Sequence, residues 1–131
     1  MSADRTHQPP GYPTVSVYMM AEGAGRVIDF ATGVLGGEVL MRLDREDGSL
    51  MHGAFRIGDS VIMLADATKE YPGFPVWLHV YVPDVDAVYQ RALEKGATSV
   101  QEPSEQGVGD RRGGVKDPAG NTWWIATPVK G

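Results

Sequence analysis

The 131-residue chain contains no cysteine. This absence excludes disulfide bonds and thiolate metal sites, and it fits the reducing cytoplasm, where we expect the protein to reside. The chain also lacks an excess of positive charge, because its formal net charge is −5. Proteins that bind nucleic acids gather lysine and arginine to neutralise phosphates, so we expect no nucleic-acid partner.

Long hydrophobic runs are absent as well. No apolar stretch approaches the roughly 20 residues that cross a bilayer, so we expect no membrane partner. Residues 1–13 are polar and rich in proline, without the apolar centre of a secretory signal, and we expect a flexible tail there. The remaining residues, 14–131, have the length and composition of a single globular domain.

The hydrophobic pattern predicts a repeated order of elements. Helical spacing covers 26–35 and 85–95, and each stretch is followed by a glycine, Gly36 or Gly96, that suits a left-handed cap. Strands are predicted over 14–20, 38–43, 50–57, 60–65, 76–82 and 97–101 and in a final hairpin over 109–127. The order strand, helix, three strands therefore occurs twice, over about 14–66 and 76–127. We expect an α+β fold in which two βαβββ modules form a curved mixed sheet around a cleft, with the helices on the outside.

Strand alternation places both histidines of the domain on the concave face of this sheet. The two-residue loop 58–59 predicts a hairpin in which Ile57 faces Ser60, and this register turns His52 and Met63 to the concave side. The same alternation turns His79 to that side. Two interpretations stay open: the histidines contact a ligand or exchange protons with it, or they are half-buried, hydrogen-bonded strand residues.

Aromatic side chains share this predicted face. Tyr18, Trp77, Tyr81 and Trp124 could form a slot for a planar or apolar ligand. Alternatively, the two tryptophans plug the space between the modules. Met63 suits either packing or a tolerant pocket wall.

Charged residues lie at the start of the final hairpin. Asp110 and Arg111 are expected near the pocket mouth, where an arginine can grip a ligand carboxylate or phosphate with two hydrogen bonds. The alternative is an Asp–Arg pair that orders the loop.

Several motifs carry a resemblance to a known family. They are the runs at 26–30, 57–66 and 81–87, and Gly-Asp-Arg at 109–111 followed by Asp-Pro-Ala-Gly-Asn at 117–121. In these motifs the chain resembles the vicinal oxygen chelate superfamily of glyoxalases, bleomycin-resistance proteins and extradiol dioxygenases, and it is most similar to small bacterial glyoxalase-like proteins. The resemblance implies paired βαβββ modules and usually a homodimer.

The resemblance also implies four metal-ligand positions, at which this sequence departs from the family. Members that use a divalent ion hold it with histidine, glutamine or glutamate on the first and last strand of each module. The matching positions here are Ser16, Met63, Trp77 and Trp124, none of which suits a catalytic divalent cation.

Three hypotheses follow. The first is a protein that binds a small organic molecule without a metal or other cofactor and without turnover, as in drug sequestration. Its ligand-binding residues would be Ser16 together with the concave-face and loop residues named above. The second is a metal-dependent lyase, isomerase or dioxygenase with His52 and His79 at a displaced site. The third is a dimerising unit that binds a protein partner and no small ligand. The lost ligand set favours the first hypothesis and argues against an enzyme.

Overall fold

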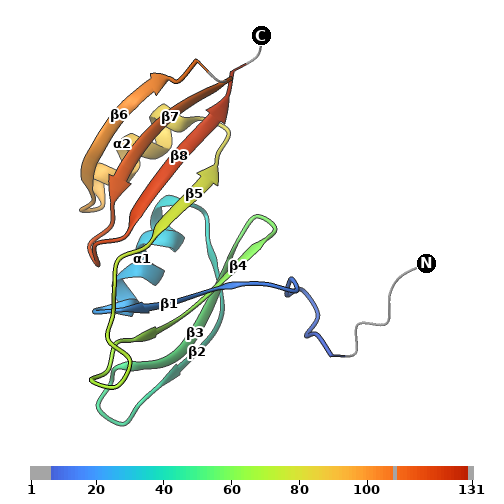
Figure 1. The fold of residues 1–131 in the computed structure, drawn as a ribbon, viewed down its shortest axis with the longest axis vertical. Helices are drawn as coiled ribbons and strands as arrows, with labels where there is room; N and C mark the ends of the chain where they lie inside the picture. The colour runs from blue at the N-terminus through green and yellow to red at the C-terminus, as the bar shows by residue number, and fades with distance from the viewer. Residues whose placement is uncertain (1–6, 108, 130–131) are drawn as a thin grey trace.

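The computed structural model describes residues 7–107 and 109–129. Eight strands and two helices are present in these residues, and Figure 1 shows them grouped into two modules, one for each half of the chain. The elements are β1 (Val17–Ala21), α1 (Ala24–Val34), β2 (Glu38–Asp44), β3 (Leu50–Ile57), β4 (Ser60–Asp66), β5 (Trp77–Tyr81), α2 (Val85–Glu94), β6 (Thr98–Glu105), β7 (Asp110–Lys116) and β8 (Thr122–Pro128).

Each module contributes one four-stranded mixed sheet. The N-terminal sheet has the order β1-β4-β3-β2 and the C-terminal sheet has the order β5-β8-β7-β6. In both sheets the first strand of the module pairs in parallel with the last, and the remaining pairs are antiparallel. The α+β fold of two βαβββ modules, predicted from the sequence, is confirmed.

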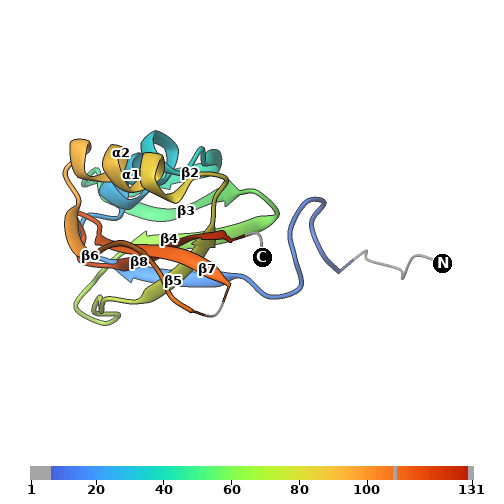
Figure 2. The same ribbon diagram turned by 90° about the horizontal axis from the view of Figure 1, so that it is seen from above.

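The two helices lie on the same side of the molecule. Figure 2 shows α1 and α2 side by side above the strands, and α2 packs against β6, β7 and β8. Neither helix, at 11 and 10 residues, has the length that a membrane-crossing helix needs.

The predicted hairpin register is confirmed. Ile57 pairs with Ser60 and Ala54 with Met63, while Gly58 adopts the positive φ of 57° that a tight turn of this kind requires. The apolar face of the hairpin, with Phe55 and Leu64, is buried against α1.

Two element boundaries differ from the prediction. Helix α1 begins at Ala24 rather than residue 26, because the side chain of Asp66 in β4 accepts hydrogen bonds from the backbone at the start of the helix. Strand β6 runs to Glu105 rather than residue 101, because irregular pairing after Ser99 and Gln101 carries the strand on to Ser104 and Glu105, opposite β7. Of the expected flexible tail, residues 1–6 lie outside the described residues, and Arg56 donates a hydrogen bond to the carbonyl oxygen of Gly11 at 3.0 Å.

One hydrophobic core spans both modules. Phe30 of α1 packs against Trp123 of β8 with ring centroids 5.6 Å apart, so the helix of the first module contacts the last strand of the second. Both side chains are almost fully buried, as is Met19 of β1.

Asp117, in the turn between β7 and β8, organises the polar part of this core. Its carboxylate is buried and accepts hydrogen bonds from the indole N–H of Trp123 at 2.8 Å and from the backbone N–H groups of Ala119 and Asn121. Asn121 extends the network, because its side-chain oxygen accepts the N–H of Val76 just before β5. A single buried carboxylate therefore joins the last turn, the final strand and the first strand of the C-terminal sheet.

At the start of each helix, a side chain from the last strand of the same module accepts hydrogen bonds from the backbone. Asp66 of β4 accepts the N–H groups of Gly23 and Ala24 at the start of α1, and that of Leu50 at 2.6 Å. Thr127 of β8 holds the corresponding place in the second module and accepts the N–H of Val85 at 2.9 Å. These contacts satisfy the N–H groups that a helix start leaves without an intrahelical acceptor.

Replacement of Asp117 by alanine should destabilise the protein strongly. The D117A substitution leaves buried N–H donors without an acceptor, and we expect the free energy of unfolding to fall by about 2–4 kcal/mol. Urea denaturation followed by tryptophan fluorescence measures this change. The matched control is D59A, because Asp59 is exposed and accepts only from Ser60 among the contacts of the described residues; its effect should stay within about 0.5 kcal/mol. Equal effects of the two substitutions would contradict the role given to Asp117.

Asp66 should make stability depend on acid pH. Partial burial alone would raise its pKa, but the hydrogen bonds from Leu50, Ala24 and Gly23 outweigh burial and hold the pKa below the ordinary value of 3.8. The folded state therefore favours the carboxylate, and this stabilisation is present above pH 3.8 and is lost as the pH falls through the lowered pKa.

The D66N variant provides the test. Urea denaturation between about pH 5 and about pH 2.5 should show a smaller loss of stability with acid in D66N than in the unsubstituted protein. Some loss remains in the variant, because the pKa values of Asp47 and Asp86 are also lowered. If the free energy of unfolding fell equally with pH in D66N and in the unsubstituted protein, Asp66 would not contribute to the acid dependence of stability.

Candidate functional site

The side of the C-terminal sheet that faces away from α2 carries a group of aromatic side chains. Strand alternation on β5 turns Leu78 and Val80 toward the core and leaves Trp77, His79 and Tyr81 exposed. Trp77 is 75% exposed and Tyr81 is 63% exposed. We call this side the open face; it comprises Trp77, His79, Tyr81, Arg112, Gly114 and Trp124.

Trp124 forms the centre of the open face. It pairs laterally with His79 on one side and Gly114 on the other. The edge of Trp77 meets its ring at a centroid distance of 5.3 Å, and the guanidinium carbon of Arg112 lies 5.6 Å from its centroid. A Cβ atom at Gly114 would lie 2.6 Å from the Trp124 ring, so glycine is needed for this ring to lie close to the backbone of β7.

A second group lies on the N-terminal sheet. The hydroxyl of Tyr18 and Nδ1 of His52 are 3.2 Å apart, and their rings stack at 5.7 Å. Met63 pairs with Tyr18 across β1 and β4. His52 thus has a hydrogen-bonding partner on its own sheet, while the ring of His79 lies 4.8 Å from Tyr81 on the other sheet.

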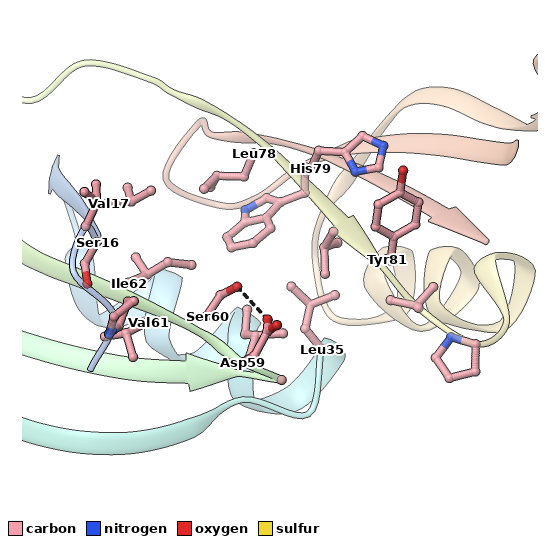
Figure 3. A pocket seen from close by; sticks show the side chains of 18 residues that line it. Ser16, Val17, Leu35, Asp59, Ser60, Val61, Ile62, Leu78, His79 and Tyr81 are labelled. Carbon is pink, nitrogen blue, oxygen red and sulfur yellow. Dashed lines mark hydrogen bonds between the residues drawn. The ribbon is translucent and has the colours of Figure 1, made fainter. Parts of the chain in front are cut away.

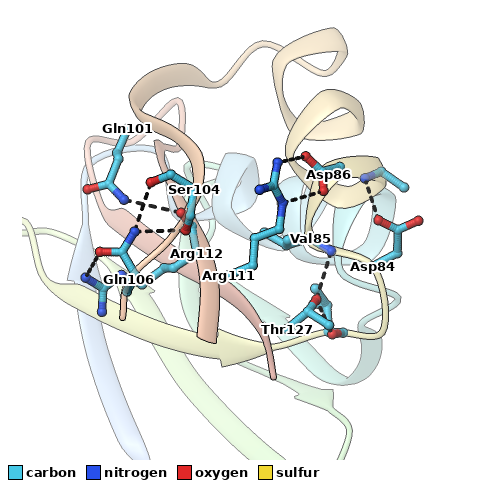
Figure 4. Close-up of polar contacts among 11 residues, drawn as sticks. Asp84, Val85, Asp86, Gln101, Ser104, Gln106, Arg111, Arg112 and Thr127 are labelled. Atoms are coloured by element: carbon cyan, nitrogen blue, oxygen red, sulfur yellow. Dashed lines mark hydrogen bonds and ion pairs between the residues drawn. The ribbon is translucent and has the colours of Figure 1, made fainter. Parts of the chain in front are cut away.

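Arg111 is held by α2. It donates two hydrogen bonds of 2.8 Å to the carboxylate of Asp86, in the first turn of the helix, as Figure 4 shows. These hydrogen bonds lower the pKa of Asp86 and raise the pKa of Arg111. Asp110, whose carbonyl oxygen accepts the N–H of Gln106, is not the partner of Arg111 in this contact. Arg111 therefore points to the helix side of β7.

A cavity of about 650 Å³ lies at the boundary between the modules. Figure 3 shows Leu78, Ile62 and Val17 around it, and His79 and Tyr81 of β5 also border it. Most of its lining is aliphatic, and polar groups come from Ser16 and from the hydrogen-bonded pair Asp59 and Ser60. The predicted site residues that border the cavity are Ser16, His79 and Tyr81; those that do not are Tyr18, His52, Met63, Trp77, Asp110, Arg111 and Trp124.

Comparison with known proteins identifies the family. The model of the Glyoxalase/Bleomycin resistance protein/Dioxygenase superfamily matches residues 16–125, nearly the whole domain. The chain belongs to this superfamily. The resemblance inferred from the sequence motifs is thereby confirmed.

Several known proteins match most of the chain. An uncharacterized protein of Mycobacterium tuberculosis is 35% identical over 144 residues, an alignment that covers 96% of this chain and 85% of the relative. Among solved structures, TioX from Micromonospora sp. ML1 superposes with a TM-score of 0.70 at 22% identity, covering 91% of this chain and 98% of TioX. The fosfomycin resistance protein FosX from Mesorhizobium loti gives a TM-score of 0.66 at 13% identity, with coverage of 89% and 92%. These structural likenesses show the fold.

The four positions at which the resemblance implies metal ligands carry side chains that are poor ligands for a divalent ion. Ser16, Met63, Trp77 and Trp124 offer a hydroxyl, a thioether and two indoles, whereas a catalytic divalent cation takes imidazole or carboxylate ligands. Within residues 7–107 and 109–129, no three His, Asp or Glu side chains come together in a way that could hold a metal ion.

Sequence reasoning missed Arg112 and Gly114. It placed Asp110 and Arg111 near the pocket mouth and considered Arg111 as the ligand-binding cation. Because β7 already begins at Asp110, the two arginines alternate: Arg111 points to the helix side and Arg112 lies over Trp124. Period-two alternation, extended back to residue 110, would have found Arg112.

Proposed function

We propose that this protein binds a small planar organic molecule on the open face, without a metal ion and without chemical turnover. The observation that carries the proposal is Trp77, which is 75% exposed and rests with its edge against Trp124. An exposed indole beside a second indole offers a stacking surface, and contiguous exposed apolar patches are typical of binding sites.

The family and one structural neighbour support a role in resistance to a small compound. The superfamily includes bleomycin resistance proteins, and FosX is a fosfomycin resistance protein. We infer a similar protective role here, in which an aromatic compound is held and not converted. The donor chemistry of Ser16, Met63, Trp77 and Trp124 supports binding without a metal, and the cysteine-free composition is compatible with a cytoplasmic location.

We also propose that the protein works as a homodimer. The N-terminal sheet exposes apolar side chains along β2 and β3, where Val39, Leu43 and Met51 are each more than 40% exposed. A second copy would cover such a surface by the two-fold pairing that is common among small proteins. Light scattering should then give twice the 14.1 kDa mass of one chain, and a monomer at micromolar concentration would refute this part.

A titration with planar probes tests the binding proposal. Calorimetry and thermal-shift measurements with 2-methylnaphthalene, 2-naphthylmethylammonium and 2-naphthoate should show saturable binding of at least one probe. The W77A substitution removes a stacking partner and should weaken that binding roughly ten-fold. Chelation with EDTA should leave the affinity unchanged.

The control is Y71A, because Tyr71 is 61% exposed but lies in the connection between β4 and β5, away from the open face. The substitution should not change binding. The proposal fails if no probe binds, if Y71A weakens binding as much as W77A, or if chromatography shows that the protein converts the bound compound.

A further inference from the structure

Arg112 is the cation of the open face, and neutral groups hold it in place. Its terminal nitrogen Nη2 donates to the side-chain oxygen of Gln106 at 3.0 Å, and Gln106 is itself fixed by two hydrogen bonds to Ser104. Figure 4 shows this chain of contacts on one side of β7 and the pair formed by Arg111 and Asp86 on the other. Among the described residues Arg112 forms no ion pair, in contrast to Arg111 beside it.

Two N–H donors of the open face lack an acceptor. Nε of Arg112 and Nε1 of Trp124 are shielded from solvent, and neither has a hydrogen-bond partner in the described part of the chain. Buried donors without an acceptor are uncommon and cost free energy, whereas Trp123, the neighbouring tryptophan, donates to Asp117. Both unpartnered donors belong to side chains that already contact each other, with the guanidinium over the indole.

We propose that the ligand of the open face is a planar aromatic carboxylate. A carboxylate supplies acceptors for Arg112 and Trp124 and neutralises a cation that lacks a charged partner, while the aromatic part of the ligand stacks with Trp77. This inference rests on the proposed function and names its ligand class. Because both N–H groups are shielded in the free chain, binding requires a side-chain movement. Trp77 is the most exposed tryptophan and the least confined member of the group.

The geometry also separates the two adjacent arginines in function. Arg112 contacts the open face, whereas both donor groups that Arg111 directs at α2 are taken by Asp86. Loss of Arg111 should therefore leave ligand affinity unchanged, although the two residues carry the same charge and are neighbours in the chain. This gives the experiment a matched control.

The test compares 2-naphthoate with 2-methylnaphthalene, which has the same rings and no acceptor. Calorimetry and ligand-observed NMR should give an affinity for 2-naphthoate at least ten-fold higher. The R112M substitution should remove this preference, and W124F, which keeps an aromatic ring but has no N–H, should reduce it. R111M should leave it unchanged. Circular dichroism verifies that each variant is folded, and R112K, which retains the charge, should retain part of the preference if R112M does not fold.

The outcomes separate this inference from the proposed function. Equal affinities for the two probes, with W77A weakening both, would support binding on the open face and overturn the carboxylate. The carboxylate inference would also be overturned if R112M kept the preference for 2-naphthoate, or if R111M and R112M lost it equally. In either case the preference would not depend on the position of Arg112. If neither probe binds, the proposed function and the inference both fail.

Discussion

The hydrogen bonds accepted by the buried Asp117 carboxylate constrain the rest of the structure. They fix the turn before β8, draw the indole of Trp123 into the core and, through Asn121, set the start of β5. Trp123 in turn packs on Phe30, so the second module is joined to the helix of the first. The two modules therefore share one core, and the position of β8 relative to β5 follows from a single polar centre.

This constraint determines what the open face presents. Once Trp123 is held inward, strand alternation turns Trp124 outward, opposite His79 on one side and Gly114 on the other. Two consecutive tryptophans thus take opposite roles: Trp123 is buried with its N–H satisfied, and Trp124 lies under Trp77 and Arg112 with its N–H unsatisfied. The contrast between these two indoles is the physical basis of the proposed ligand site.

Local signals predicted most of the fold, and contacts distant in sequence account for the rest. The loop at 58–59 predicted the register of β3 and β4, and the helix predicted from residue 85 begins there, capped by Asp84, which accepts the N–H of Ala87. The start of α1 could not be predicted, because its cap comes from Asp66, which lies beyond two intervening strands. The period-two pattern correctly predicted that Trp77, His79 and Tyr81 point away from the core. Their role in binding stays a prediction. Arg112 was missed because period-two alternation was not applied to the two arginines at the start of β7.

The indole N–H resonances of the three tryptophans offer the most direct test of this account. In a two-dimensional ¹⁵N–¹H spectrum, the Trp123 resonance should exchange slowly with solvent, because it is buried and bound to Asp117. Addition of 2-naphthoate should shift the Trp77 and Trp124 resonances and leave that of Trp123 in place. A ligand that shifts Trp123 while Trp77 and Trp124 stay unchanged would contradict the division between core and open face, and with it the proposed site.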